Sequence, residues 1–353
     1  MASELKKPHA IHAVDLFCGV GGLTSGLVEA GCHVVAGVDV DVACRYPFEV
    51  NHKGSIFLER DVAELSPDEL QAMWQPGVTR LLAGCAPCQP FSSYARGVAS
   101  DHKKWGMLFE FARLVRQTLP DLVTMENVPG LVRQAPFAEF QSTLRNSGYH
   151  VVHGVLNAAD FGVPQTRKRL VLLASRVGPV VLPKPTHPGS GRWVTVRQAV
   201  GALPKIVDGQ AHRGDALHKA AELSALNKQR VRYSRPGGTW RDWPVELVAE
   251  CHRKASGSRS AGVYGRMEWD KPAPTMTTLC NGYGNGRFGH PEQHRAISLR
   301  EAAIFQSFPA DYRFLPIGQQ VQAKTVARLI GNAVPPKLGL AVGRALLAAI
   351  VEN

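Results

Sequence analysis

A cysteine in a short Pro- and Ser-rich stretch could act as a nucleophile. GCAPCQPFSSYARG (84–97) contains Cys85 and Cys88 at CxxC spacing, with Pro87 before Cys88 and Gln89 after it. A thiolate is a strong nucleophile, so Cys88 is a candidate for covalent attack on an electrophilic carbon. No second cysteine pair or histidine stands at ligand spacing, which argues against zinc. A redox pair and a buried structural cysteine are the alternatives.

A candidate acid stands at the end of another apolar run. Glu126 of MENVPG (125–130) follows this run directly, so we expect a partly buried carboxyl group. Burial disfavours the charged form, which makes Glu126 a candidate proton donor. A structural acid bonded to the backbone is the alternative.

Three polar side chains alternate farther along the chain. Gln165, Arg167 and Arg169 occupy every second position where the chain enters RLVLLAS (169–175). Alternation in a strand sends side chains to one face, so these three could act together. A solvated basic edge strand is the alternative.

A glycine-rich turn and two acids suggest a nucleoside cofactor. FCGVGG (17–22) follows an apolar run, and its glycines permit a sharp turn and close approach to a ligand. Asp39 ends the second apolar run and could bind two ribose hydroxyls, while Asp61 ends the third, placed to accept from an adenine amino group. Each acid could instead cap a helix. The full GxGxxG pattern is absent, which disfavours NAD.

These residues all follow segments that are predicted to be strands. The segments are 11–17, 32–39, 55–61, 79–85, 121–128, 149–157 and 169–175. Helical stretches alternate with them, and apolar residues between Met107 and Leu119 recur at helical spacing. The pattern predicts an α/β fold with a doubly wound, mostly parallel sheet, whose ligands bind at the carboxyl ends of the strands.

Composition limits the kind of protein. The chain has 353 residues, 44% hydrophobic and 20% charged, typical of a globular protein of about two domains. No apolar run approaches the roughly 18 residues of a membrane span, and the N-terminus lacks the apolar core of a signal peptide. Seven scattered cysteines fit a reducing compartment, so we expect a cytoplasmic protein. The net charge of +12 favours a polyanionic partner.

A basic region interrupts the strand–helix rhythm after residue 185. Residues 186–294 contain 16 Lys and Arg against nine Asp and Glu, and four of the six tryptophans. The segment 227–241 places cations around a tyrosine and a tryptophan, which suits a nucleic-acid surface. A solvated face is the alternative. The candidate nucleic-acid contacts in this segment are Arg230, Arg232, Arg235 and Arg241.

Order returns at the C-terminus. Residues 297–308 have helical periodicity, and so do 324–353, interrupted by GNAVPP. We expect the last helix to pack on the first domain. The sequence thus predicts a first domain of residues 1–185, completed by 320–353, and an irregular, basic second domain of residues 186–319. The resemblance described next implies that the first is catalytic and that the second binds DNA.

The order of these motifs resembles the cytosine carbon-5 DNA methyltransferases. The matching segments run through nearly the whole chain: DLFCGVGGL, Asp39, Asp61, PCQPFS, ENV, QTRKR, REAAIFQSFP and GNAVPP. The appearance is closest to bacterial enzymes of restriction–modification or orphan type. GRMEWDKPAPTMTT (265–278) looks like the end of their target-recognition region.

The resemblance implies a role for each motif. Cys88 would attack carbon 6 of a flipped-out cytosine, and Glu126 would bond the ring nitrogen and amino group. Arg167 and Arg169 would hold the base and its phosphate, with Gln165 and Gln89 nearby. The residues implied to bind S-adenosylmethionine are Phe17, Gly19, Gly21, Gly22, Asp39, Asp61, Pro87, Asn332 and Val334.

The resemblance also implies partners. Double-stranded DNA would lie in a cleft, contacted by Thr275 and by Ser92 of a candidate lid at 92–106. We expect no bound metal, no membrane association and a monomeric enzyme. A separate nuclease could be its partner. The chain departs from the usual Pro-Pro-Cys, having Ala86 before Pro87 and an extra Cys85, and Asp39 stands where many relatives have Glu.

Three other functions compete with this one. A tRNA-directed member of the superfamily would carry Cys-Phe-Thr, whereas Cys280 is followed by Asn281. An inert DNA-binding homologue would lack the cysteine, the glutamate or a cofactor acid. A nicotinamide-dependent oxidoreductase would leave Cys88 and the basic region unexplained.

Overall fold

The chain divides into two compact units. The structure, a computed structural model, describes residues 10–87, 106–254 and 262–351. Unit 1 comprises residues 1–161, 168–186 and 334–353, and unit 2 comprises residues 162–167 and 187–333. From sequence the boundaries were expected after residue 185 and before residue 320. In the structure the chain returns to unit 1 at Val334, because α10 (Ala323–Asn332) packs on α9 (Leu299–Phe305) within unit 2.

A seven-stranded sheet forms the centre of unit 1, in the order β3-β2-β1-β4-β5-β7-β6. Every neighbouring pair up to β5 is parallel, and only β7 runs against its two neighbours. The prediction of a mostly parallel, doubly wound sheet is therefore confirmed. The strands are β1 (Ile11–Leu16), β2 (His33–Asp39), β3 (Ile56–Glu59), β4 (Thr79–Gly84), β5 (Leu122–Asn127), β6 (His150–Asn157) and β7 (Lys168–Ser175).

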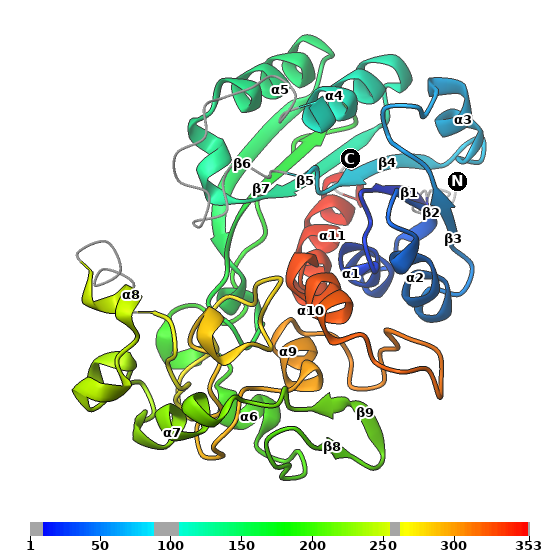
Figure 1. Cartoon of the computed structure of the whole chain (residues 1–353). Helices are drawn as coiled ribbons and strands as arrows, with labels where there is room; N and C mark the ends of the chain where they lie inside the picture. The colour runs from blue at the N-terminus through cyan, green and yellow to red at the C-terminus, as the bar shows by residue number, and fades with distance from the viewer. Residues whose placement is uncertain (1–9, 88–105, 255–261, 352–353) are drawn as a thin grey trace, which may run out of the picture. The chain divides into compact units, whose positions relative to one another are not determined.

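Helices cover both faces of this sheet, because its strands are apolar on both sides. On one face, Val14, Leu82 and Met125 join a core that includes helical residues such as Phe111 and Phe140. In Figure 1, α4 and α5 lie on this side of the sheet, and α1 and α11 lie on the other. The helices of unit 1 are α1 (Gly22–Ala30), α2 (Arg45–Asn51), α3 (Pro67–Ala72), α4 (Gly106–Thr118), α5 (Ala135–Asn146) and α11 (Pro336–Val351).

Helix α4 confirms the predicted helical spacing. Leu108, Phe111, Leu114, Val115 and Thr118 recur every three or four residues and are buried. This apolar stripe packs the helix on the sheet, and the polar positions between them remain at the surface.

The last helix packs closely against the first, as expected for the C-terminal segment. A Cβ on Gly26 of α1 would lie 2.3 Å from the backbone nitrogen of Leu340 and 2.3 Å from the carbonyl oxygen of Pro336. A Cβ on Gly339 would lie 3.0 Å from the carbonyl oxygen of Leu23. Glycine at both positions therefore lets the two helix backbones approach, and Leu27, Leu338, Val342 and Leu346 fill the core beside them.

One segment, Ala323–Ile350, is long and apolar enough to cross a membrane by length and composition, with a mean hydropathy of 1.4. It is not an unbroken apolar run, because Lys324, Arg328, Lys337 and Arg344 interrupt it. The segment comprises α10 and α11, and 56% of its most apolar window is buried. Core helices meet the same criterion, and the packing of α11 on α1 supports that interpretation.

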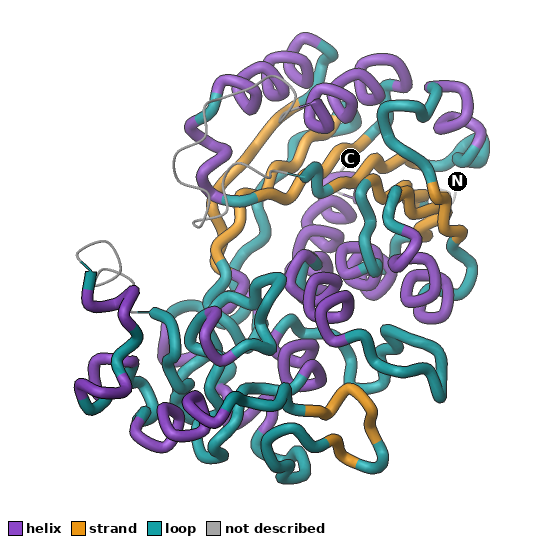
Figure 2. Tube along the Cα trace, viewed as in Figure 1, coloured by secondary structure: helices purple, strands orange, loops and turns teal. Residues whose placement is uncertain are grey.

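Unit 2 consists mainly of loops with short helices and one hairpin (Figure 2). Its small apolar core includes Val231, Trp240, Trp243 and Tyr283. Unit 2 also contains a buried ion pair. Arg295 and Glu301 are each 1% exposed and form a bidentate ion pair with N–O distances of 2.8 Å. The other elements are β8 (Ala211–His212), β9 (Asp215–Lys219), α6 (Val196–Val200), α7 (Ala225–Tyr233) and α8 (Glu250–Arg253).

Candidate active site

The loop between β1 and α1 has an unusual backbone. Phe17, Gly19 and Gly21 have φ angles of 56°, 55° and 85°, in the left-handed region that favours glycine. A Cβ on Gly21 would lie 2.2 Å from Cε1 of His52, so this position also needs glycine for space. A Cβ on Gly19 would meet no atom within 4 Å, and Gly22 begins α1. The loop therefore leaves room beside Gly19.

Asp39 fixes the shape of this loop. It ends β2, and its Oδ2 accepts the backbone N–H of Gly19 at 2.9 Å. Its Oδ1 accepts the backbone N–H of Asp41, also at 2.9 Å. Burial raises the pKa of Asp39, and these two N–H donors oppose the shift. The glycine turn and the acid at the end of the second strand, which were predicted to serve one cofactor, are thus joined directly by a hydrogen bond.

Asp15 belongs to the same region but was missed from sequence. It lies on β1, is 1% exposed, and its Oδ2 accepts the hydroxyl of Thr24 at 2.7 Å. Its Oδ1 has no hydrogen-bond partner among the described residues. Burial raises the pKa of Asp15 to about 7, and the nearby charge of Asp39 adds to the shift. The sequence signal that could have identified Asp15 was an acidic residue inside a strand of mainly apolar residues.

Asp61 lies two residues beyond the end of β3, the strand beside β2. Its Oδ1 accepts the backbone N–H of Ala63 at 2.9 Å. Asp61 therefore caps a local turn and not a helix.

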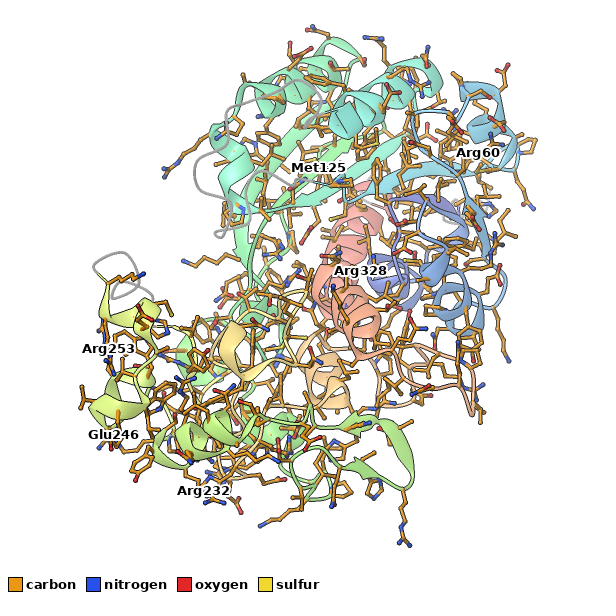
Figure 3. The ribbon with its side chains drawn as sticks, viewed as in Figure 1. Arg60, Met125, Arg232, Glu246, Arg253 and Arg328 are labelled. Atoms are coloured by element: carbon orange, nitrogen blue, oxygen red, sulfur yellow. The ribbon has the colours of Figure 1, made fainter. Side chains whose placement is uncertain are left out.

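Glu126 lies near the end of β5 with a contact on each carboxyl oxygen. The Sγ of Cys85 donates to Oε2 at 2.9 Å, and the Nε of Arg169 lies 2.9 Å from Oε1. Both side chains of this ion pair are largely buried, with 14% of Arg169 and 7% of Glu126 exposed. Met125, labelled in Figure 3, is fully buried just before it. The expected burial of Glu126 is thus observed.

The segment that leads to the cysteine loop is tied to the same strand. The side-chain amide of Asn127 donates to the carbonyl oxygen of Ala86 at 3.0 Å, and Ala86 is buried. Pro87 follows and is exposed. The predicted Cys88, Gln89 and Ser92, with nearly all of the candidate lid at 92–106, lie outside the described residues.

Gln165, Arg167 and Arg169 do not share one strand face. The strand β7 begins at Lys168, and Gln165 and Arg167 precede it in the segment assigned to unit 2. Gln165 is fully buried and donates to the carbonyl oxygen of Phe305 at 2.8 Å. Its Oε1 accepts the backbone N–H of Met276 at 2.8 Å.

Arg167 is buried in a comparable way. It is 2% exposed and donates to the carbonyl oxygens of Met276, Gly331 and Ala333 at 2.8 to 3.3 Å. Of the three residues, Arg169 alone belongs to unit 1, where it contacts Glu126. The prediction that all three side chains share one strand face was wrong, because β7 begins only at Lys168, after Gln165 and Arg167.

The two predicted cofactor residues of GNAVPP fall in different units. Asn332 is exposed at the end of α10 in unit 2, and Val334 is 5% exposed in the core of unit 1. The structure therefore groups Val334, but not Asn332, with the glycine loop and Asp39.

The predicted DNA contacts of unit 2 separate into buried and exposed groups. Arg230 is 8% exposed, donates to the carbonyl oxygen of Leu247 at 2.8 Å, and lies over the rings of Trp243 and Tyr264. These contacts contradict the prediction that Arg230 is an exposed phosphate contact, because its guanidinium group already contacts two aromatic rings and a carbonyl oxygen.

The other candidates are more accessible. Arg232 is exposed on α7, where Figure 3 labels it. Arg235 and Arg241 are also exposed, although Arg235 pairs with Asp242 at 2.9 Å. Thr275 is partly buried and donates to the carbonyl oxygen of Thr166 at 2.7 Å. Within the described part of the chain, no group of three or more His, Cys, Asp or Glu residues could hold a metal ion.

Comparison with known proteins decides the family. The family model of the C-5 cytosine-specific DNA methylases matches residues 11–348. The chain belongs to this family. It is 49% identical over 336 residues to the Type II methylase M.HgiDII of Herpetosiphon aurantiacus, covering 94% of each chain. It is 34% identical over 347 residues to the Type II methyltransferase M1.HphI of Haemophilus parahaemolyticus, covering 95% of this chain and 86% of the relative.

A solved structure supports the fold of this methylase. A DNA modification methyltransferase encoded within an E. coli prophage has a TM-score of 0.73 at 22% identity, covering 96% of this chain and 99% of the other. The resemblance found from the motif order is therefore confirmed. So is the prediction of an enzyme that methylates cytosine carbon 5 of DNA, in preference to a tRNA-directed enzyme.

Proposed function

We propose that this methylase transfers a methyl group from S-adenosylmethionine to carbon 5 of a flipped-out cytosine in one specific double-stranded DNA sequence. We further propose that it serves a Type II restriction–modification system, because its relatives at 49% and 34% identity carry Type II names. The observation that carries the catalytic proposal is the buried Glu126 carboxyl group, held between Cys85 and Arg169 at the end of β5. In the proposed mechanism this carboxyl group bonds the ring nitrogen of the base.

The residues of unit 1 fit S-adenosylmethionine. Gly19 leaves open space in a left-handed loop before a helix, and Asp39 presents a partly buried carboxylate beside it. Asp39 would bind the ribose hydroxyls and Asp61 the adenine amino group. Phe17, Gly21, Gly22, Pro87 and Val334 would line the remainder. When bound, the cofactor supplies an electrophilic methyl group on a sulfonium centre.

The chain's own residues would activate the cytosine. Cytosine carbon 5 is a weak nucleophile, and the base must leave the duplex to be reached. The thiolate of Cys88 adds to carbon 6 of the base. The π electrons that this new bond displaces are stabilised by the proton that Glu126 holds at the ring nitrogen, and the product is an enamine. This enamine is nucleophilic at carbon 5, the position that is methylated. Loss of the carbon-5 proton to solvent then expels Cys88 as a thiolate. The ring nitrogen returns its proton to the Glu126 carboxylate, which restores the aromatic ring.

Arg169 would support this step by holding the Glu126 carboxyl group. Gln165 and Arg167, buried in unit 2, would act by fixing their own segment. Gln89 would lie near the flipped nucleotide. The exposed Arg232, Arg235 and Arg241 would bind phosphates, with Ser92 and Thr275 as further DNA contacts. We also propose that the enzyme is a cytoplasmic monomer.

Bisulfite sequencing tests the proposed function. The protein is expressed in a methylation-free bacterial host beside Cys88→Ser and Glu126→Gln controls. We expect protected cytosines in one short sequence context for the wild type and none for Cys88→Ser. Full conversion of host DNA by bisulfite, from a folded wild type that binds S-adenosylmethionine, would contradict the proposal.

A further inference from the structure

Cys85 lies directly beside Glu126 because of the sheet register. Gly84 of β4 pairs with Met125 of the parallel strand β5, so the next residue on each strand, Cys85 and Glu126, are also neighbours. Their side chains point to the face that carries Leu81, Ala83 and Leu122. The thiol is partly buried there, and its sulfur lies 2.9 Å from Oε2 of Glu126.

The two oxygens of Glu126 have different partners. A neutral thiol donates at Oε2, while the Nε of a guanidinium lies near Oε1. These partners come from β4 and β7, the strands on either side of β5. Rotating the carboxyl group would forfeit one contact or both, so its orientation is set before any base arrives.

Cys85 is also, with Ala86, one of two residues by which the chain departs from the usual sequence around the nucleophile. Neither the covalent attack by Cys88 nor cofactor binding uses it. Its thiol nevertheless faces the one carboxyl group that the proposed mechanism requires.

We propose that Cys85 is a positioning residue for Glu126, whose thiol hydrogen bond sets the orientation of the carboxyl group for bonding the target cytosine. The proposal rests on the proposed function. It assigns Cys85 a part in methyl transfer that involves no covalent bond to the sulfur.

Cys85→Ala and Cys85→Ser test this role together. Alanine removes the donor, whereas serine keeps an O–H donor at the same position. The measured quantities are the single-turnover rate of methyl transfer to duplex DNA, the Kd values for S-adenosylmethionine and DNA, and the pH profile of the rate. Cys32→Ala is the matched control, because Cys32 is also a unit 1 thiol and is buried. It precedes the amino end of β2, whereas Cys85 follows the carboxyl end of β4.

We expect Cys85→Ala to lower the single-turnover rate about tenfold, as for loss of a hydrogen bond to a charged group, with both Kd values unchanged. Its pH profile should also change, because the carboxyl group loses a hydrogen-bond partner. Serine should restore the rate to within about threefold and the profile to its original position. Cys32→Ala should leave the profile in place.

Two results would overturn the inference alone. An alanine variant with the wild-type rate and profile would remove any role for the thiol. Equal losses in the alanine and serine variants, with weaker cofactor binding and an unmoved profile, would reduce Cys85 to a packing residue. Absence of methylation by the wild type would instead refute the proposed function, and the inference with it.

Discussion

The backbone N–H of Gly19 donates to Oδ2 of Asp39 across 2.9 Å. This bond joins the loop after β1 to the end of β2, the adjacent strand in the sheet. The carboxylate that we propose to hold the ribose therefore also shapes the glycine loop beside it. A change at Asp39 should consequently affect two parts of the cofactor site at once.

Asp39→Asn tests this dual role. An asparagine has one acceptor oxygen, so one of the two backbone N–H groups would face an NH₂ donor instead. We expect the Kd for S-adenosylmethionine, measured by calorimetry, to rise about 10- to 100-fold. Asp41→Asn, which alters a neighbouring carboxyl group that caps a turn at Ala43, should change it by less than about threefold. Similar effects of both variants would argue against Asp39 as the ribose acceptor.

Gly21→Ala should destabilise unit 1. The new Cβ would have a left-handed φ of 85° and lie 2.2 Å from Cε1 of His52. Strain and overlap together predict a loss of about 2–5 kcal/mol in the free energy of unfolding, measured in urea. Gly54→Ala has φ 96° but open space around its Cβ, so strain alone predicts about 1–2 kcal/mol. Equal losses would show that the His52 contact is relieved at no cost.

Two arginines of unit 2 should give opposite phenotypes. Arg232→Ala should weaken DNA binding and reduce the slope of log K against log salt by about one, because an exposed phosphate contact is lost. Arg230→Ala should instead lower the free energy of unfolding by about 2 kcal/mol, because it removes a buried cation between Trp243 and Tyr264. Salt titrations of DNA binding and urea unfolding, run on both variants, check the assignment. An unchanged salt slope in Arg232→Ala would place that side chain away from DNA.

Asp15 should make stability depend on pH. Its pKa is raised from 3.8 to about 7, so the folded state holds the proton more tightly than the unfolded state. The charged form is penalised on folding, and stability falls as pH rises from about 4 to about 7. Asp15→Asn removes this penalty. Relative to wild type, the variant should gain about 2–3 kcal/mol between pH 5 and pH 8.

Urea unfolding at pH 5 and pH 8 measures this difference. Asp68→Asn, on the exposed first turn of α3, is the control and should show no such pH dependence. A constant difference between Asp15→Asn and wild type at both pH values would contradict the raised pKa.

The strands of unit 1 could be predicted because they are buried on both faces and are read as apolar runs. Strands β1 to β6 fall within predicted segments, and β7 begins one residue before its segment. Asp39 ends β2 as expected, and Glu126 is the penultimate residue of β5. Contacts between strands could not be predicted in this way. The hydrogen bond from the Cys85 thiol to Glu126 depends on the register of β4 against β5, and no local sequence pattern encodes that register.

Unit 2 was less predictable because few of its residues lie in regular elements. Arg230 has the same sequence surroundings as Arg232, yet one is buried and the other exposed. The rings that cover Arg230 come from Trp243 and Tyr264, which are distant in sequence. Gln165 and Arg167 were misjudged for a similar reason, since their partners lie more than 100 residues away.

The six residues 162–167 have a consequence for how unit 2 could be exchanged between related enzymes. They precede β7 in the chain but belong to unit 2, where Gln165 and Arg167 satisfy backbone groups of Met276 and Gly331. A transplanted fragment of residues 187–333 alone would leave those buried groups unpaired. Recombination that replaces unit 2 with that of another methylase would thus have to carry two separate stretches of gene, or retain a compatible hexapeptide in the recipient.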